Sequence, residues 1–178
     1  RRLPSVCPRG RLLPSRSQAL RRLPANSTMI TPPSMSNTRR FVCNPANMQG
    51  QNGMSVFSIN ASDLFSNGSL AQVEITSATG SSSDSQGVII NVAGASVNWT
   101  SPFNFVGDFA TNTWRQKVIW NFHEATTLAC GSHQMNGAVL APLAAVTSSN
   151  NFDGSLVCRS LTTTGEFMYI GNALASQT

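Results

Sequence analysis

The segment Asn136-Gly137-Ala138-Val139-Leu140-Ala141 recurs seventeen positions later as Asp153-Gly154-Ser155-Leu156-Val157-Cys158. In both segments, a turn dipeptide whose glycine can adopt a positive φ is followed by a short apolar strand. A glycine-led strand that returns after fewer than about twenty residues is typical of stacked coils, each laying one strand on the strand before. The repeat therefore predicts an all-β fold, a β-solenoid of short strands, with a β-sandwich as the alternative.

Further strands are expected on both sides of this repeat. Residues 117–122 carry two large aromatic side chains in a strand-like run, and residues 87–93 are β-branched and almost continuously apolar. A short helix is expected to begin after Ser62 as its N-cap. The remaining predicted strands lie near 54–59, 72–76, 96–100, 125–130, 143–147, 155–159 and 167–170. No apolar window reaches the length of a membrane-spanning helix.

Charge is scarce and unevenly distributed. Only 11% of the residues are charged, while Ser, Thr, Asn and Gly are abundant, a composition that favours a secreted β-protein over a cytosolic enzyme. Nine of the twelve basic residues lie in residues 1–40, which contain no acid, so residues 41–178 carry 3 − 7 = −4 charges. The high pI therefore comes from the N-terminal stretch and does not indicate a nucleic-acid-binding domain.

The N-terminal stretch repeats an Arg-Leu-Pro pattern every ten residues. Segments 1–5, 11–15 and 21–25 share it, and apolar periodicity is absent. Such a sequence predicts disorder, because it offers too little apolar surface to bury. We expect a disordered basic leader or tail over residues 1–40 and one β domain over residues 41–178.

The four cysteines form no CxxC pair, and the chain has only two histidines. A metal site needs clustered thiolates or imidazoles, so the sequence predicts no metal and no other cofactor. In an oxidising compartment we expect a Cys130–Cys158 disulfide between neighbouring coils. The alternative is that both cysteines are buried thiols that behave as small apolar residues.

The stretch Trp120-Asn-Phe-His-Glu-Ala-Thr-Thr-Leu128, with Gly137-Ala-Val-Leu-Ala-Pro142 after it, resembles the choice-of-anchor A domain. This family contains bacterial-type surface and secreted modules, including some in collagen-binding adhesins. The resemblance covers about residues 54–170 and leaves the opening strands of the family without a counterpart. Its motif residues, which we interpret as core and turn positions, are Trp120, Asn121, Phe122, Ala125, Thr126, Thr127, Leu128, Gly137, Leu140, Ala141, Pro142, Gly154, Gly165 and Glu166.

The resemblance implies a non-enzymatic adhesive or structural module at the cell surface or in the secreted fraction. Its partner would be an extracellular matrix protein or a glycan, and exposed strand edges would allow self-association. A looser similarity to ice-binding β-solenoids gives the alternative, an ice-binding or carbohydrate-binding module. Ice binding calls for a flat, regular array of Thr residues, but Thr126, Thr127, Thr147 and Thr162–Thr164 do not recur at constant spacing.

A polysaccharide-degrading β-helix enzyme is the remote alternative. Paired carboxylates on adjacent coils would supply its acid and base, and the best candidates are His123 and Glu124 with Asp108 and Glu166. His123 and Glu124 are consecutive, however, so in a strand they would point to opposite faces. We therefore expect no catalytic residues.

The aromatic residues suggest two roles. Trp120 and Phe122 lie two positions apart on one strand face and are expected to pack in the core. Trp99 and Trp114 lie nearer to predicted loops and are the candidate ligand surface. Asn60, Asn67 and Asn98 begin N-glycosylation triplets.

Overall fold

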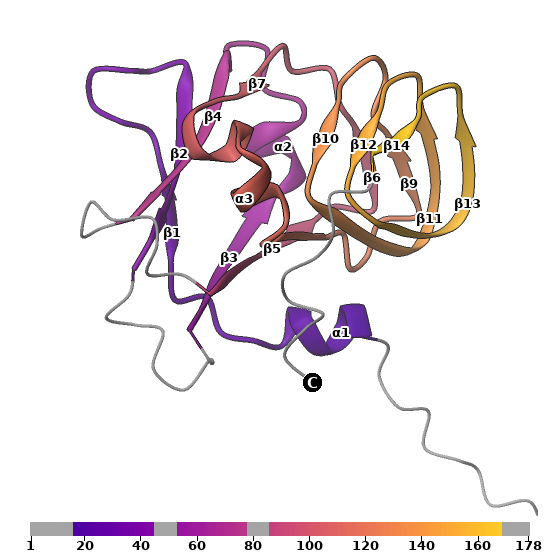
Figure 1. Cartoon of the computed structure of the whole chain (residues 1–178), viewed down its shortest axis with the longest axis horizontal. Helices are drawn as coiled ribbons and strands as arrows, with labels where there is room; N and C mark the ends of the chain where they lie inside the picture. Colours follow the sequence, from indigo (N-terminus) through magenta and orange to yellow (C-terminus); the bar gives the residue numbers. More distant parts are fainter. Residues whose placement is uncertain (1–15, 45–52, 78–85, 169–178) are drawn as a thin grey trace, which may run out of the picture.

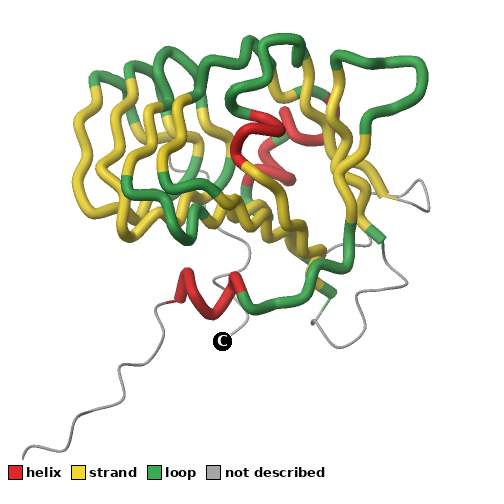
Figure 2. The backbone as a smooth tube through the Cα atoms, turned by 180° about the vertical axis from the view of Figure 1, so that it is seen from behind, coloured by secondary structure: helices red, strands yellow, loops and turns green. Residues whose placement is uncertain are grey.

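The computed structural model describes residues 16–44, 53–77 and 86–168, and this part of the chain is mostly β (Figures 1 and 2). The all-β prediction is confirmed. The strands are β1 Thr28–Ile30, β2 Thr38–Cys43, β3 Met54–Asn60, β4 Gln72–Ser77, β5 Gly87–Ala93, β6 Ser96–Asn98, β7 Asn104–Phe105, β8 Val118–Asn121, β9 Thr127–Ala129, β10 Met135–Asn136, β11 Ala138–Ser148, β12 Phe152–Asp153, β13 Leu156–Thr163 and β14 Phe167–Met168. The helices are α1 Arg16–Arg21, α2 Ala61–Leu64, η3 Gly107–Ala110 and α3 Asn112–Arg115.

Residues 118–168 wind three times round a curled, β-helix-like path, and each coil contributes to three walls (Figure 1). The first wall contains β3, β5, β8 and the first halves of β11 and β13. The second wall contains β6, β9 and the second halves of β11 and β13. The third wall contains β10, β12 and β14. Every ladder within these walls is parallel, which favours the coiled arrangement over a sandwich.

The two copies of the sequence repeat lie side by side in consecutive coils of the structure. Val139 pairs with Leu156 and Ala141 with Cys158, the partners that the seventeen-residue offset predicts. On the third wall, Asn136 pairs with Asp153 at the same offset. β11 is one continuous strand through Pro142, where the sequence predicted two strands, because a change of register between Ala141 and Ala145 bends it round the corner.

Glycine makes the corner between the third and first walls possible. Gly137 and Gly154 both have positive φ, 103° and 150°, and they lie on top of each other in consecutive coils. A Cβ atom built on Gly154 would overlap the backbone oxygen of Gly137. The coils can therefore stack at their normal spacing only because neither corner carries a side chain.

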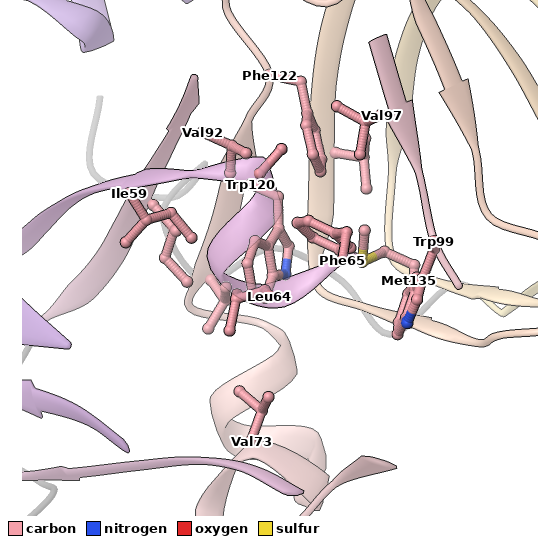
Figure 3. Packing of buried hydrophobic residues seen from close by; sticks show 14 of the residues in the cluster. Ile59, Leu64, Phe65, Val73, Val92, Val97, Trp99, Trp120, Phe122 and Met135 are labelled. Carbon is pink, nitrogen blue, oxygen red and sulfur yellow. The ribbon is translucent and has the colours of Figure 1, made fainter. Parts of the chain in front are cut away.

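The interior of the coils around Trp120 of β8 is filled with aromatic rings. Trp120 is fully buried and lies within about 6 Å, between ring centroids, of Phe41, Phe65 and Phe109. Figure 3 shows Trp120 among Leu64, Phe65 and Met135. The prediction that Trp120 and Phe122 pack in the core is confirmed, since both side chains have no exposed area.

A second, smaller sheet in the order β1-β2-β4-β7 lies beside the coils (Figure 1). Phe41 of β2 and Val73 of β4 are fully buried and belong to the same hydrophobic cluster as Trp120. The sheet and the coils therefore share one core.

The structure corrects two predictions near the N-terminus. Residues 16–40, expected to be disordered, contain α1, β1 and the start of β2; residues 1–15 lie outside the described part. Composition misled here because this stretch is held by pairing with distant strands rather than by apolar side chains of its own. The α2 helix is capped by Asn60 rather than Ser62, in a capping box with Asp63.

Candidate functional site

The outward side of the first wall is covered by α1. The fully buried Asn121 accepts a hydrogen bond from the Ser17 hydroxyl at 2.7 Å and donates to the Ser17 carbonyl at 2.9 Å. Asn121 also donates to Asn91 in the neighbouring strand at 2.7 Å, and Asn91 donates to the Leu20 carbonyl at 3.2 Å. Two stacked asparagines thus fix the helix to the wall, and this part of the wall is not available to a ligand.

The outward side of the third wall is partly covered by the segment that contains η3 and α3. Asn136 donates to the Phe109 carbonyl at 3.2 Å, and Arg115 of α3 forms an ion pair with the buried Asp153. These contacts cover the first two strands of the wall, β10 and β12.

The second wall is the exposed one. Its outward side chains form two columns in register across four strands: Ser96, Thr127, Ala145 and Ser160, then Asn98, Ala129, Thr147 and Thr162. Six of these eight side chains are exposed, and Ala129 and Ala145 are half-buried. All eight are small and uncharged, so the wall presents methyl and hydroxyl groups in a flat array.

Residues under the second wall hold it flat. Val97, Leu128 and Val146 lie between the outward residues of the first three strands, pair in register and are at most 2% exposed, whereas the corresponding Leu161 of the last strand is 37% exposed. Within the columns, the Thr127 hydroxyl donates to the Ser96 hydroxyl at 2.9 Å. At the end of the wall, the Ser149 hydroxyl donates to the Gly131 carbonyl at 2.8 Å. The array is therefore preorganised on a packed layer rather than carried on mobile loops.

The sequence spacing of the threonines hid this array. Paired residues are 18 positions apart between β9 and β11 (Thr127 and Ala145) but 15 apart between β11 and β13 (Thr147 and Thr162). The corners absorb the difference, so unequal coils still give an aligned wall. The sequence signal that was missed is a triplet of small, apolar and small residues in each strand: Ser96-Val-Asn, Thr127-Leu-Ala, Ala145-Val-Thr and Ser160-Leu-Thr.

The proposed tryptophan ligand surface is wrong. Trp99 is 3% exposed and Trp114 is 4% exposed. Trp99 lies between the rings of Phe103 and His133, with centroid distances of 4.7 and 4.6 Å, and its indole nitrogen donates to the Ser101 carbonyl. Proximity to a loop did not imply exposure, because these loops fold over the aromatic core. Phe103 and Phe109 are also buried and belong to the same core cluster.

The candidate acid–base residues are not brought together. Glu124 accepts a hydrogen bond from the Gly94 backbone nitrogen at 2.7 Å and lies 3.8 Å from the Nδ1 atom of His123. Burial lowers the pKa of His123, as does the nearby Arg21, while Glu124 raises it. Asp108 lies in η3 and Glu166 precedes β14, and no group of three or more His, Cys, Asp or Glu side chains that could hold a metal ion occurs in the described ranges.

The predicted Cys130–Cys158 disulfide is not formed in the structure. Both cysteines are free thiols; Cys158 lies in the first wall opposite Ala141, whereas Cys130 follows β9 of the second wall. Burial raises the pKa of Cys130 to about 12 and also raises that of Cys158. The two residues lie in the first and third coils and on different walls.

The other predicted positions fall into two groups. The motif residues Trp120, Asn121, Phe122, Ala125, Leu128 and Ala141 are buried, as expected of core positions. Of the glycosylation triplets, Asn60 and Asn98 are exposed and Asn67 is half-buried. No helix in the described part of the chain combines the length and hydrophobicity that crossing a membrane requires.

A family model described as "Putative Ice-binding-like adhesive domain" matches residues 12–169. The match includes α1, β1 and β2, which precede the residues covered by the choice-of-anchor A resemblance. It supports an adhesin-like domain and not the choice-of-anchor A family specifically. Neither a curated protein nor a solved structure matches the chain significantly. Since the match spans most of the sequence, the chain belongs to the ice-binding-like adhesive domain family.

Proposed function

We propose that this protein is a β-solenoid adhesive domain that binds an ordered, hydrated surface, such as ice, through its second wall. The observation that carries the proposal is the pair of columns formed by Ser96, Thr127, Ala145 and Ser160 and by Asn98, Ala129, Thr147 and Thr162. The eight side chains are in register and uncharged, and six of them are exposed.

The geometry of such a wall suits a repeating surface better than a single small molecule. Parallel strands repeat at about 4.8 Å, and alternate residues along a strand at roughly 6.6 Å, so the outward groups form a two-dimensional lattice. Methyl groups exclude loosely ordered water, while hydroxyl groups can donate and accept hydrogen bonds in fixed positions. Charged side chains would keep their own water shells and prevent close contact over the wall.

The proposal has no catalytic step. Adhesion of this kind needs only a rigid surface, which the buried Val97, Leu128 and Val146 provide. A location at the cell surface or outside the cell accords with the adhesive family and with the low charge of the chain. A matrix protein or a glycan is the alternative partner for the same wall.

The test is adsorption to growing ice and thermal hysteresis of the full chain, compared with two single variants. Thr127→Lys places a long charged side chain in the first column and is expected to abolish adsorption. Thr113→Lys makes the same change at an exposed position of α3, away from the wall, and is expected to adsorb like the parent.

Equal adsorption of all three proteins would contradict the assignment of the wall. Absence of ice adsorption, together with binding to collagen or to a glycan that Thr127→Lys removes, would keep the wall and replace the partner. Binding that neither variant affects would overturn the proposal.

A further inference from the structure

A polar pocket of about 240 Å3 lies between the third wall and the segment formed by residues 103–115. Its lining includes Asn104 and Phe105 of β7, Arg115 of α3, His133, Gln134 and Asn150. Three of these side chains end in amides and one in a guanidinium, so planar hydrogen-bonding groups converge on one small space. The volume lies below the range of about 300–1,000 Å3 that is usual for drug-sized ligands, and so suits a single small ring.

A buried carboxylate holds two of the lining side chains. Asp153 is 3% exposed, and its Oδ2 atom accepts hydrogen bonds from both Arg115 and Gln134. Its other oxygen, Oδ1, and the Nε atom of Arg115 are buried without a hydrogen-bond partner in the described part of the chain. Both atoms lack accessible surface and Asp153 is not among the lining residues, so the carboxylate serves to position the Arg115 and Gln134 side chains that face the pocket.

A hydroxyl group matches the amide and guanidinium groups of the lining, because it donates one hydrogen bond and accepts others. Asp153 and Arg115 neutralise each other, so the pocket offers no net charge to attract an ionic ligand. Burial lowers the pKa of His133, which keeps its imidazole neutral at pH 7. The chemistry therefore favours an uncharged molecule that carries several hydroxyl groups.

The aromatic lining adds a stacking surface. The ring of His133 lies flat on Trp99, with 4.6 Å between centroids and 8° between planes. Trp99 covers one face of the imidazole, so the part of His133 that lines the pocket is its other face or its edge. The imidazole provides a flat surface against which the apolar face of a sugar ring can pack, and Phe105, whose ring stands at 77° to that of Trp99, adds an apolar side to the pocket.

From these observations we infer that the pocket binds one neutral saccharide unit. The unit is held by hydrogen bonds to Asn104, Arg115 and Gln134 and by packing on His133. The pocket is separate from the second wall, and the inference does not depend on the surface-binding function proposed above. It gives the domain a second site, which recognises single sugar residues rather than an extended lattice.

The experiment uses ligand-observed saturation-transfer NMR on the full chain. The probes are D-glucose, D-galactose, D-mannose and N-acetyl-D-glucosamine, with D-glucuronate as the charged counterpart. At least one neutral sugar is expected to bind, and to bind more tightly than glucuronate.

Arg115 is not the residue to replace, since its loss would leave Asp153 buried and unpaired and would unfold the site. Gln134→Ala and Asn104→Ala change exposed residues. Each is expected to weaken sugar binding about tenfold, because a hydrogen bond in a polar site is lost. Gln86→Ala, an exposed position that is not among the pocket lining, is the matched control.

Three results would overturn the inference: no neutral sugar binds, glucuronate binds best, or Gln134→Ala and Asn104→Ala bind like Gln86→Ala. The Thr127→Lys variant separates this site from the wall. It is expected to lose ice adsorption and to keep sugar binding, whereas Gln134→Ala is expected to do the reverse.

Discussion

The first and second walls are built from the same kind of parallel ladder, and β11 runs through both, yet they have opposite roles. The outward residues of the first wall include Ile89, Asn91 and Asn121, which are buried, and α1 is hydrogen-bonded to the two asparagines. The second wall carries Ser, Thr, Ala and Asn, and most of these side chains are exposed. Backbone geometry is common to both walls, so the side chains that point outward decide whether a wall takes a helix or meets solvent.

The largest expected effect comes from the corner that both walls depend on. In Gly154→Ala, the new Cβ atom would overlap the Gly137 backbone and the residue would keep a strained positive φ. We expect the free energy of unfolding to fall by more than about 3 kcal/mol, since backbone strain and overpacking add. Urea denaturation followed by circular dichroism measures the change.

Gly68→Ala is the matched control, because a Cβ atom at Gly68 would meet nothing within 4 Å. Its stability is expected to stay within about 0.5 kcal/mol of the parent. If Gly154→Ala were as stable as Gly68→Ala, the stacked corner would not be what limits the coil spacing.

The next largest effect on stability is expected from replacing an outward asparagine by leucine on the first wall, compared with the same substitution on the second wall. Asn121→Leu would remove three hydrogen bonds and leave Ser17 and Asn91 with buried polar groups unpaired. We expect a loss of about 2–4 kcal/mol, because unpaired buried groups cost about 1–3 kcal/mol each and are partly relieved by movement of the helix. Chemical denaturation gives the total, and hydrogen exchange at residues 16–21 reports whether α1 detaches.

Asn98→Leu makes the same change on the second wall, where the side chain is exposed. Its free energy of unfolding should differ from that of the parent by no more than about 0.5 kcal/mol. Similar losses in the two variants would show that α1 does not depend on Asn121.

A smaller effect is the expected loss of folding stability at acidic pH. The pKa values of His123 and His133 are both lowered in the folded chain, mainly by burial. Below the usual histidine pKa of about 6.5, the unfolded chain takes up protons more readily than the folded chain, so stability is full above that pH and is lost as the pH falls. Thermal melting between pH 7.5 and 5.5 should show the decline. In the double variant His123→Gln/His133→Phe the decline should be weaker, and an unchanged slope would contradict this origin.

The sequence predicted the coils better than the site, for a physical reason. The offset between Gly137 and Gly154 gave the register of β10 with β12 and of the first halves of β11 and β13 correctly, because a corner glycine and the strand after it are both local signals. Exposure is not local. Trp99 and Trp114 were assigned to the surface, but both are buried, and Trp99 lies against His133, 34 positions further along the chain. The prediction of disorder for residues 16–40 was wrong for the same reason, since Ser17 forms a hydrogen bond with Asn121, which is distant in the sequence.

The sequence did not predict the second wall as a binding surface, because the threonines are unequally spaced along the chain. Unequal spacing along the chain does not exclude an aligned array on the wall, since the corners absorb the difference. Thr147 and Thr162 are adjacent although the coil between them is shorter than the one before. Only the triplets of small, apolar and small residues carry the pattern, and eight small side chains resemble ordinary strand surface until the register is known.

The central claim is that the ligand surface is the second wall and not the first, and β11 allows the most direct test. Thr147→Lys and Leu140→Lys place the same charged side chain on one strand, on the second and first walls respectively. Both proteins are checked for folding by thermal melting, and their adsorption to growing ice is then measured beside the parent. We expect Thr147→Lys to lose adsorption and Leu140→Lys to keep it. Retained adsorption in Thr147→Lys, with loss in Leu140→Lys, would contradict it.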